Sequence, residues 1–359
     1  MTSGCQKLPL QCSRHYRERV DNEIGGTAVA ERNGKRPTIY DVAQEAGVAT
    51  STVSRALANP ERVNARTREH VLTVAERLGY RTNPLARALP SGRTQTVALS
   101  VSDITNPHFF GVIRGAEQQT RAAGYTLILG DTEESPDLET SNIERLSGSV
   151  DGFVIAASRM SDEQIATLAT SHRLTLLSRQ VPGVPSVIVD HEDGTRQIIE
   201  HLASLGHTSV VYLAGPRRSW LASRRWHSIQ ASAARHGMTA TRLGPFPPAV
   251  VGGAAAADAT IGHGATAAIA HNDLLAIGML RRLAARDVHV PRDLSVVGYD
   301  DIFGTDFCSP PLTTLAGHFE EAGRLAVDLL LGSRRGGPAP QRVLPSYLVV
   351  RESTGPALR

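Results

Sequence analysis

A hydroxyl-rich segment near the amino end combines residue types that suit contact with nucleic acid. In TIYDVAQEAGVATSTVSRALANP, Gly47 permits a sharp turn between two helical patterns, and Val53 and Leu57 face inward at i and i+4. The other face of the second helix carries four hydroxyls and one guanidinium, on Thr50, Ser51, Thr52, Ser54 and Arg55. Short hydroxyls approach phosphate oxygens and base edges closely, and arginine reaches guanine in the major groove. The segment therefore predicts a helix-turn-helix unit with a recognition helix.

Three helices should position this face. Apolar periodicity predicts them over residues 40–46, 50–58 and 65–78, with Asn64 as the N-cap of the third and Gly79 just past its end. The alternative is a three-helix bundle whose hydroxyls merely face water, and the clustering of so many hydroxyls beside one arginine favours the DNA-binding interpretation.

Charge and composition limit the classes of protein. The chain has 359 residues, enough for two or three folding units, and a formal net charge of only +3. Between Glu31 and Thr94, however, eleven Lys or Arg residues face six Asp or Glu residues, which is typical of a nucleic-acid footprint or of a solvated basic surface. No long apolar run and no signal peptide is evident, and the three scattered cysteines form no disulfide framework, so the cytoplasm is the expected compartment.

Beyond the basic segment, apolar runs alternate with helical patterns. One series contains TVALSVS, YTLILGD, VDGFVIAAS, LTLLSRQ and PSVIVD, and a second contains HTSVVYLAG, ATAAIAHND and LSVVGYDD. Two consecutive βα series predict two doubly wound parallel-sheet subdomains that face each other across a cleft. Ligands of such sheets bind at the carboxyl ends of the strands, so the polar residues that follow these runs are candidate ligand contacts.

The segment 37–355 resembles the lactose/galactose repressor (LacI/GalR) family of bacterial transcription regulators. The resemblance is strongest over TIYDVAQEAGVATSTVSRALANPERVNARTREHVLTVAERLGYRTNPLARAL and continues to RESTGP. It implies an all-α helix-turn-helix headpiece followed by a core similar to periplasmic sugar-binding proteins. The implied domains are a headpiece over 37–82, a hinge over 83–94 and a core over 95–355, while residues 1–36 have no sustained periodicity and are expected to form a disordered extension. Within the core, one subdomain is expected over about 95–190 and 317–342, and the other over about 191–313 and 343–355.

The resemblance also implies which residues contact DNA. Thr50, Ser51 and Arg55 are expected to read bases, with Thr52 beside them. The expected phosphate contacts are Thr38, Tyr40, Ser54, Asn59, Asn64 and Thr67. The hinge is similar to a short helix that folds in the minor groove, with contacts from Asn83 and Ala86 and a wedge at Leu89. Thr82 and Pro90 depart from the family pattern, and Pro90 should end this helix sharply.

The implied effector contacts come from several strand ends of both subdomains. They are Asn106, Phe109, Phe110, Ser178, Arg179, Arg225, Asn272, Asp300 and Phe319. One of the paired phenylalanines is expected to pack the following helix onto the sheet instead, and either Asn272 or Asp273 is expected to cap a helix. Amide, carboxylate and guanidinium groups beside aromatic rings suit a sugar, and the same rings could stack a nucleoside or purine.

These expectations define a transcription regulator, most simply a repressor, that binds a partly palindromic operator as a homodimer and responds to a small effector. Catalysis is not expected, because HEDGT lacks the second histidine of a zinc helix and no phosphate loop or dinucleotide fingerprint occurs. No metal or cofactor is expected. A sugar-binding transport protein is the alternative from another class, but it would need a secretion signal and no headpiece.

Overall fold

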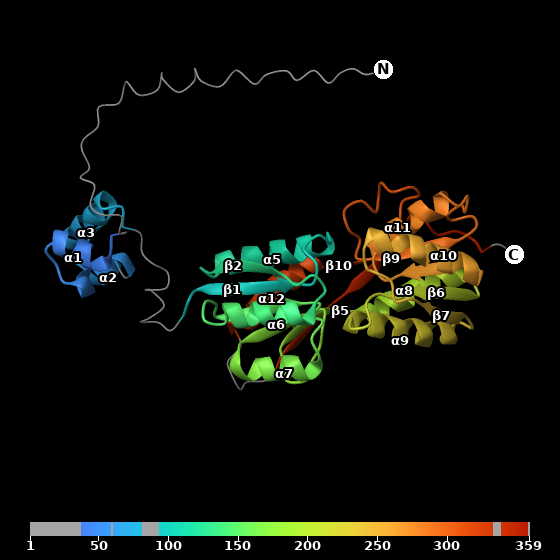
Figure 1. Ribbon diagram of the computed structural model, residues 1–359, viewed down its shortest axis with the longest axis horizontal. Coiled ribbons are helices and arrows are strands. Elements are labelled where there is room, and N and C mark those ends of the chain that lie inside the picture. Colours follow the sequence, from blue (N-terminus) through green and yellow to red (C-terminus); the bar gives the residue numbers. More distant parts are fainter. Residues whose placement is uncertain (1–36, 59, 81–92, 333–338, 358–359) are drawn as a thin grey trace, which may run out of the picture. The chain divides into compact units, whose positions relative to one another are not determined.

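The computed structural model describes residues 37–58, 60–80, 93–332 and 339–357. By its internal contacts the chain divides into one unit that runs to Asn83 and a second that begins at Pro84. Figure 1 shows the helical first unit in blue and the two sheets of the second unit in cyan to red.

The first unit is a small helical domain. It contains α1 (Ile39–Glu45), α2 (Thr50–Ala58), a short 3-10 turn at Pro60–Arg62 and α3 (Ala65–Arg77). Its buried core takes residues from all three helices, namely Val42, Ala43, Ala46, Val53, Ala56, Val71, Val74 and Ala75. The three predicted helices are confirmed to within one residue at each end.

Specific residues fix the turn between α1 and α2 and the starts of α1 and α3. Gly47 has a φ of +63°, a left-handed conformation that favours glycine, and it separates α1 from α2. Thr38 and Asp41 form a capping box at the start of α1, and the side chain of Asn64 accepts a hydrogen bond from the Arg66 amide at 3.0 Å. These caps begin α1 and α3 without using any residue of the α2 outer face.

The second unit begins with a six-stranded parallel sheet. Its strands are β1 (Thr96–Val101), β2 (Thr126–Asp131), β3 (Gly152–Ala156), β4 (Leu174–Leu177), β5 (Ser186–Val189) and β11 (Gln341–Leu344). Their order is β11-β5-β4-β3-β1-β2. The helices of this subdomain are α5 (His108–Ala122), α6 (Pro136–Leu146), α7 (Asp162–Ser171) and α12 (Phe319–Gly332).

Alternating side chains bury both faces of this sheet. Val97 and Leu99 of β1 pack with α5 and α12, whereas Ala98 packs with α6 and α7. Helices on both sheet faces explain why the strands read as nearly continuous apolar runs (Figure 1).

A second six-stranded sheet follows. Its strands are β6 (Ser209–Leu213), β7 (Thr239–Leu243), β8 (Ala267–Ala270), β9 (Ser295–Tyr299), β10 (Thr313–Gly317) and β12 (Ser346–Val349). Their order is β12-β10-β9-β8-β6-β7. Its helices are α8 (His191–Ser204), α9 (Trp220–Arg235), α10 (Gly253–His263) and α11 (Asp273–Ala284). This sheet departs from the expected all-parallel arrangement, because β12 runs antiparallel to β10.

The chain passes between the two sheets three times. It leaves the first sheet after β5, returns after β10 through α12 to β11, and crosses again into β12. Strand membership thus assigns residues 313–317 to the second sheet and residues 341–344 to the first. All three crossings lie beside the carboxyl ends of the central strands, where the candidate ligand contacts gather.

Candidate functional site

The outer face of α2 is accessible in the structure. Ser51, Ser54 and Arg55 are exposed, and Thr50 and Thr52 are half-buried. Nothing in the described part of the chain forms an ion pair with Arg55. This face can therefore present a guanidinium and several hydroxyls to a partner, which is the chemistry that base-edge and phosphate contacts need.

The other predicted DNA contacts surround this face or lie outside the described residues. Tyr40 is 72% exposed at the start of α1, while Thr67 is half-buried on α3. Thr38 and Asn64 are exposed but already cap helices, so any phosphate contact would be additional to that role. Four predicted contacts lie outside the described residues: Asn59, Asn83, Ala86 and Leu89.

In the second unit, Arg225 and Asp300 form the centre of a buried polar cluster. Arg225 is 2% exposed on α9, its guanidinium donates to the His271 carbonyl, and one Nη lies 3.4 Å from an Asp300 oxygen. The guanidinium carbon also lies 4.0 Å from the centroid of the Tyr299 ring, a cation–π contact. A buried arginine held on three sides is preorganised to bind an oxygen-rich ligand.

The same carboxylate joins the two subdomains. The Nδ1 atom of His108, at the start of α5, lies 3.4 Å from Asp300 at the end of β9. The amide of His108 donates to the Asn106 side chain at 3.1 Å, and the Phe319 ring packs edge-on against the imidazole at 4.3 Å. Asp300 has a φ of +108°, a rarely populated conformation that directs its carboxylate to this place.

Several buried nitrogens in the cluster have no hydrogen-bond partner. They are Nδ1 of His108, both ring nitrogens of His191 and Nε of Arg225. Asp190 caps α8 by accepting from the next two amides after His191, which holds His191 in the first turn of that helix. His191 also lines a pocket of about 200 Å³ together with Trp220. Because buried polar groups normally have partners, these nitrogens indicate the place of a polar ligand.

Burial also fixes the charge of the three histidines. Burial is the largest cause that lowers the pKa of His108, where Asp300 acts in the opposite direction. It lowers the pKa of His191 and His271 well below the usual value, and the neighbouring Arg225 adds to the effect on both. All three imidazoles are therefore neutral at pH 7, and the neutral ring of His191 offers one donor and one acceptor, whereas Nδ1 of His271 is already hydrogen-bonded to the Tyr212 hydroxyl at 3.1 Å.

The remaining predicted effector residues have different places. Phe109 is buried in the core with α12, which is the packing role expected for one of the two phenylalanines, and Phe110 is 55% exposed. Asn272 caps α11 and donates to the Pro248 carbonyl at 2.7 Å, so both ends of its amide are already engaged. Ser178 is buried at the end of β4 with a φ of 58°.

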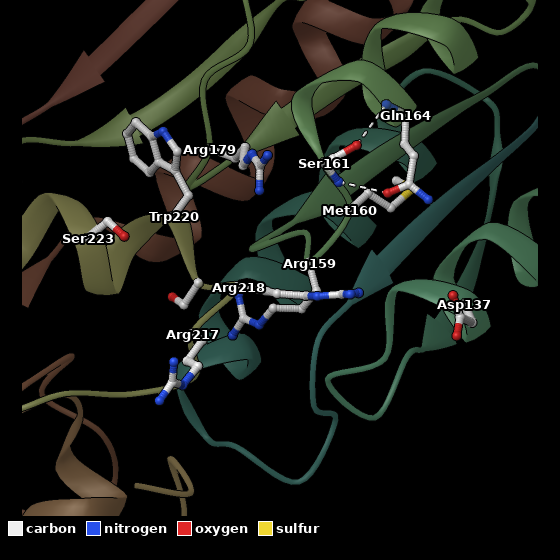
Figure 2. Close-up of a pocket in the computed structure, with 11 residues that line it drawn as sticks. Asp137, Arg159, Met160, Ser161, Gln164, Arg179, Arg217, Arg218, Trp220 and Ser223 are labelled. Carbon is white, nitrogen blue, oxygen red and sulfur yellow. Dashed lines mark hydrogen bonds between the residues drawn. The ribbon is translucent and has the colours of Figure 1, made fainter. Parts of the chain in front are cut away.

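Arg179 lines a larger pocket outside the buried cluster. This pocket has a volume of about 500 Å³, and its walls come from α6, α7, the ends of β3 and β4, and the loop between β6 and α9 (Figure 2). Trp220 lines both this pocket and the smaller one beside His191. The two pockets thus share one aromatic wall.

The sequence reasoning did not single out several of these residues. His108 lies directly before the predicted Phe109, and His271 directly before the predicted Asn272. His191 begins HEDGT, which was compared only with a zinc-binding motif. Their common signal is a position in the segment that joins a strand to the following helix, or in the first turn of that helix. Over the described ranges, no group of three potential metal ligands occurs, and no helix is long and apolar enough to cross a membrane.

Comparison with known proteins agrees with both units. The family model described as "Bacterial regulatory proteins, lacI family" matches residues 38–83, and that of a periplasmic binding protein-like domain matches residues 199–354. The transcriptional repressor CytR of Escherichia coli (strain K12) is 30% identical over 335 residues, which cover 90% of this chain and 98% of CytR. The regulator DegA of Bacillus subtilis (strain 168) is 30% identical over 339 residues, covering 89% of this chain and 99% of DegA.

Solved structures extend the similarity to three dimensions. The Lac repressor dimer bound to operator and the anti-inducer ONPF superposes with a TM-score of 0.79 at 27% identity, covering 89% of this chain and all of that one. The CelR–cellobiose complex gives a TM-score of 0.65 at 29% identity, with 89% of this chain and all of that one covered. The chain belongs to the lacI family of bacterial regulatory proteins.

Proposed function

We propose that the chain is a non-enzymatic, cytoplasmic repressor whose affinity for operator DNA is controlled by an oxygen-rich effector held between its two core subdomains. The observation that carries the effector part is the buried cluster around Arg225 and Asp300, with nitrogens that lack partners. A ligand there would satisfy these atoms and would replace or reinforce the His108–Asp300 contact between the subdomains.

The DNA-binding part uses the exposed face of α2. A headpiece over residues 37–82 and a hinge over 83–94 would dock on each half of a partly palindromic operator, with the core over 95–355 forming a homodimer. The dimeric, operator-bound state of the Lac repressor supports this arrangement. In this proposal Thr50, Ser51 and Arg55 read bases.

Arg55→Ala tests the readout. One arginine contact to a guanine is worth about 1–3 kcal/mol, so the variant should bind the operator roughly tenfold to a hundredfold more weakly and should tolerate substitution at one operator position. Gel-shift titrations on the operator and its single-base variants measure both effects. Arg68→Ala, on α3, is the control. An equal loss on every sequence would make Arg55 a phosphate contact.

Arg225→Ala tests the coupling between effector and operator. The effector should lose its influence, a coupling loss of roughly 1–3 kcal/mol, while operator affinity without ligand stays within about tenfold. Arg225→Lys keeps the charge but not the fork of donors, so its response to effector should be intermediate. This variant is the test if Arg225→Ala is poorly folded. A normal response to effector in either variant would remove Arg225 from the site.

A sugar is favoured by neutral imidazoles, a carboxylate and a guanidinium gathered in one cluster. The cellobiose complex of CelR is consistent with such a ligand. A nucleoside is the second candidate, because Phe319 and Trp220 offer aromatic faces and the CytR and PurR repressors are among the relatives.

A further inference from the structure

The pocket of about 500 Å³ has a strongly basic wall. Four of its lining residues are arginines: Arg159, Arg179, Arg217 and Arg218. Asp137 of α6 is the lone carboxylate among the lining residues, and Figure 2 shows it away from Arg217 and Arg218. Because two of the arginines come from each subdomain, a ligand in this pocket would contact both.

The two arginines of the first subdomain are largely neutralised. Arg159 donates to Glu134 at 2.9 Å and to the Ala157 carbonyl, and Arg179 donates to Asp162 at 2.6 Å. Both side chains are buried, and the Nε atom of Arg179 has no partner. The ion pairs hold the guanidinium planes still, while one buried donor remains unsatisfied at the pocket.

The two arginines of the second subdomain are not neutralised. Arg217 and Arg218 are consecutive, exposed residues in the loop before α9, and within the described ranges neither has an ion-pair partner. Ser219 caps α9 by accepting from Ala222, so the loop is fixed at the amino end of a helix of 16 residues. Two exposed guanidiniums without a carboxylate partner, beside the positive end of a helix dipole, attract an anion.

We propose that this pocket binds the oxyanion group of the effector, which is therefore an anionic, sugar-sized molecule bearing a phosphate or a carboxylate. Arg217 and Arg218 bind the oxyanion, Arg179 lines the same pocket, and Trp220 provides the wall shared with the His191 pocket. This inference rests on the proposed effector site and defines its ligand class.

The size and charge of the pocket favour this ligand over a neutral one. A volume of about 500 Å³ lies within the usual range for small-molecule sites and exceeds what a simple ion needs. A neutral sugar would leave both guanidiniums of Arg217 and Arg218 without a counterion, whereas forked guanidinium donors match the geometry of phosphate and carboxylate oxygens.

Matched ligand pairs test the proposal on the full-length protein. The pairs are glucose with glucose 6-phosphate, glucose with gluconate, ribose with ribose 5-phosphate, and cytidine with its 5′-monophosphate, and inorganic phosphate is measured alone. Thermal shift ranks them, and calorimetry gives the affinities. The test variant is Arg217→Gln/Arg218→Gln. Its control is Arg235→Gln/Arg242→Gln, which removes two exposed arginines that do not line the pocket.

The proposal expects at least one anionic member to bind roughly tenfold or more tightly than its neutral partner. The test variant should lose that difference, while the control variant should keep it. Comparison of the phosphate-bearing ligands with gluconate then shows whether the site prefers a phosphate or a carboxylate. Equal binding of both members, retention of the preference in the test variant, or no response to any anion including inorganic phosphate would overturn the proposal.

Operator gel shifts separate this outcome from the proposed function. If neutral ligands release the wild-type protein from its operator, the proposed regulatory function is correct and the proposed anionic ligand class is wrong. If wild-type protein binds no operator and no ligand, both are wrong.

Discussion

Replacing His191 by leucine should stabilise the protein without ligand and weaken its effector binding. Both ring nitrogens of His191 are buried and without partners. An unsatisfied buried polar group costs roughly 1–3 kcal/mol in mutational data, and leucine of similar volume removes that cost. We expect a net gain of about 1 kcal/mol in the free energy of unfolding at pH 7.5, since some of the gain is lost to imperfect packing.

The gain in the free energy of unfolding of His191→Leu over wild type should increase as the pH falls. Burial holds the folded-state pKa of His191 well below its usual value, whereas the unfolded chain has a pKa of about 6.5. Between these two values the unfolded state binds more protons, so the histidine lowers stability as pH falls. The slope is about 1.4 kcal/mol per pH unit for one such group. His191→Leu should therefore gain roughly a further 1 kcal/mol over wild type between pH 6.5 and 5.5, where the unfolded histidine is only partly protonated at the upper end.

Urea unfolding at several pH values measures this difference. Fluorescence reports on the second subdomain, because both tryptophans, Trp220 and Trp226, lie on α9. Burial raises the pKa of Asp273 and opposes the histidine effect in wild type, so only the difference between proteins isolates His191. Replacing the exposed His263 by leucine is the control. A variant with lower stability at neutral pH and an unchanged pH slope would refute the reasoning.

Two further predictions concern packing and capping. Gly115→Ala should destabilise the first subdomain by several kcal/mol, because the new Cβ would lie 2.7 Å from the Glu320 carbonyl carbon and closer still to its oxygen. Thermal denaturation checks this against Gly262→Ala, which meets nothing within 4 Å and should be neutral or stabilising. Asn64→Ala should cost the headpiece about 1 kcal/mol by removing the α3 cap, whereas Asn64→Ser should restore it. Equal melting temperatures for these two Asn64 variants would show that the cap contributes nothing.

The sequence predicted those elements whose pattern is local. The headpiece helices follow from apolar periodicity and caps, and the central strands except β10 (TTLAG) follow from continuous apolar runs that both sheet faces bury. The edge strands β7, with the sequence TATRL, and β11, with QRVL, were not predicted, because half-exposed strands mix polar and apolar residues. The antiparallel direction of β12 depends on a return crossing that no local pattern encodes.

The candidate site was predictable only in part. Arg225 and Asp300 were expected together, and the structure places them 3.4 Å apart. That His108 and His191 belong to the site could not be predicted from the sequence, because their burial depends on contacts between residues far apart in the chain. Asn272 fitted a ligand contact by residue type, yet its amide serves the backbone of α11 and of Pro248. Polar residues at strand ends thus mark the region, whereas helix capping and tertiary packing decide which of them are free.

The repeated crossing between the sheets also sets the order in which the two subdomains can finish folding during translation. Strand β11 and helix α12 belong to the first subdomain, but the ribosome makes nearly the whole second subdomain before it reaches them. Until then, the apolar face that Ala326, Val327 and Leu330 later cover is open, as is one edge of β5. A nascent chain therefore carries a half-covered sheet while the second subdomain is made, which makes it a substrate for chaperones and for aggregation. Neither lobe is a contiguous stretch of the gene, so recombination that exchanges effector specificity has to move both lobes together.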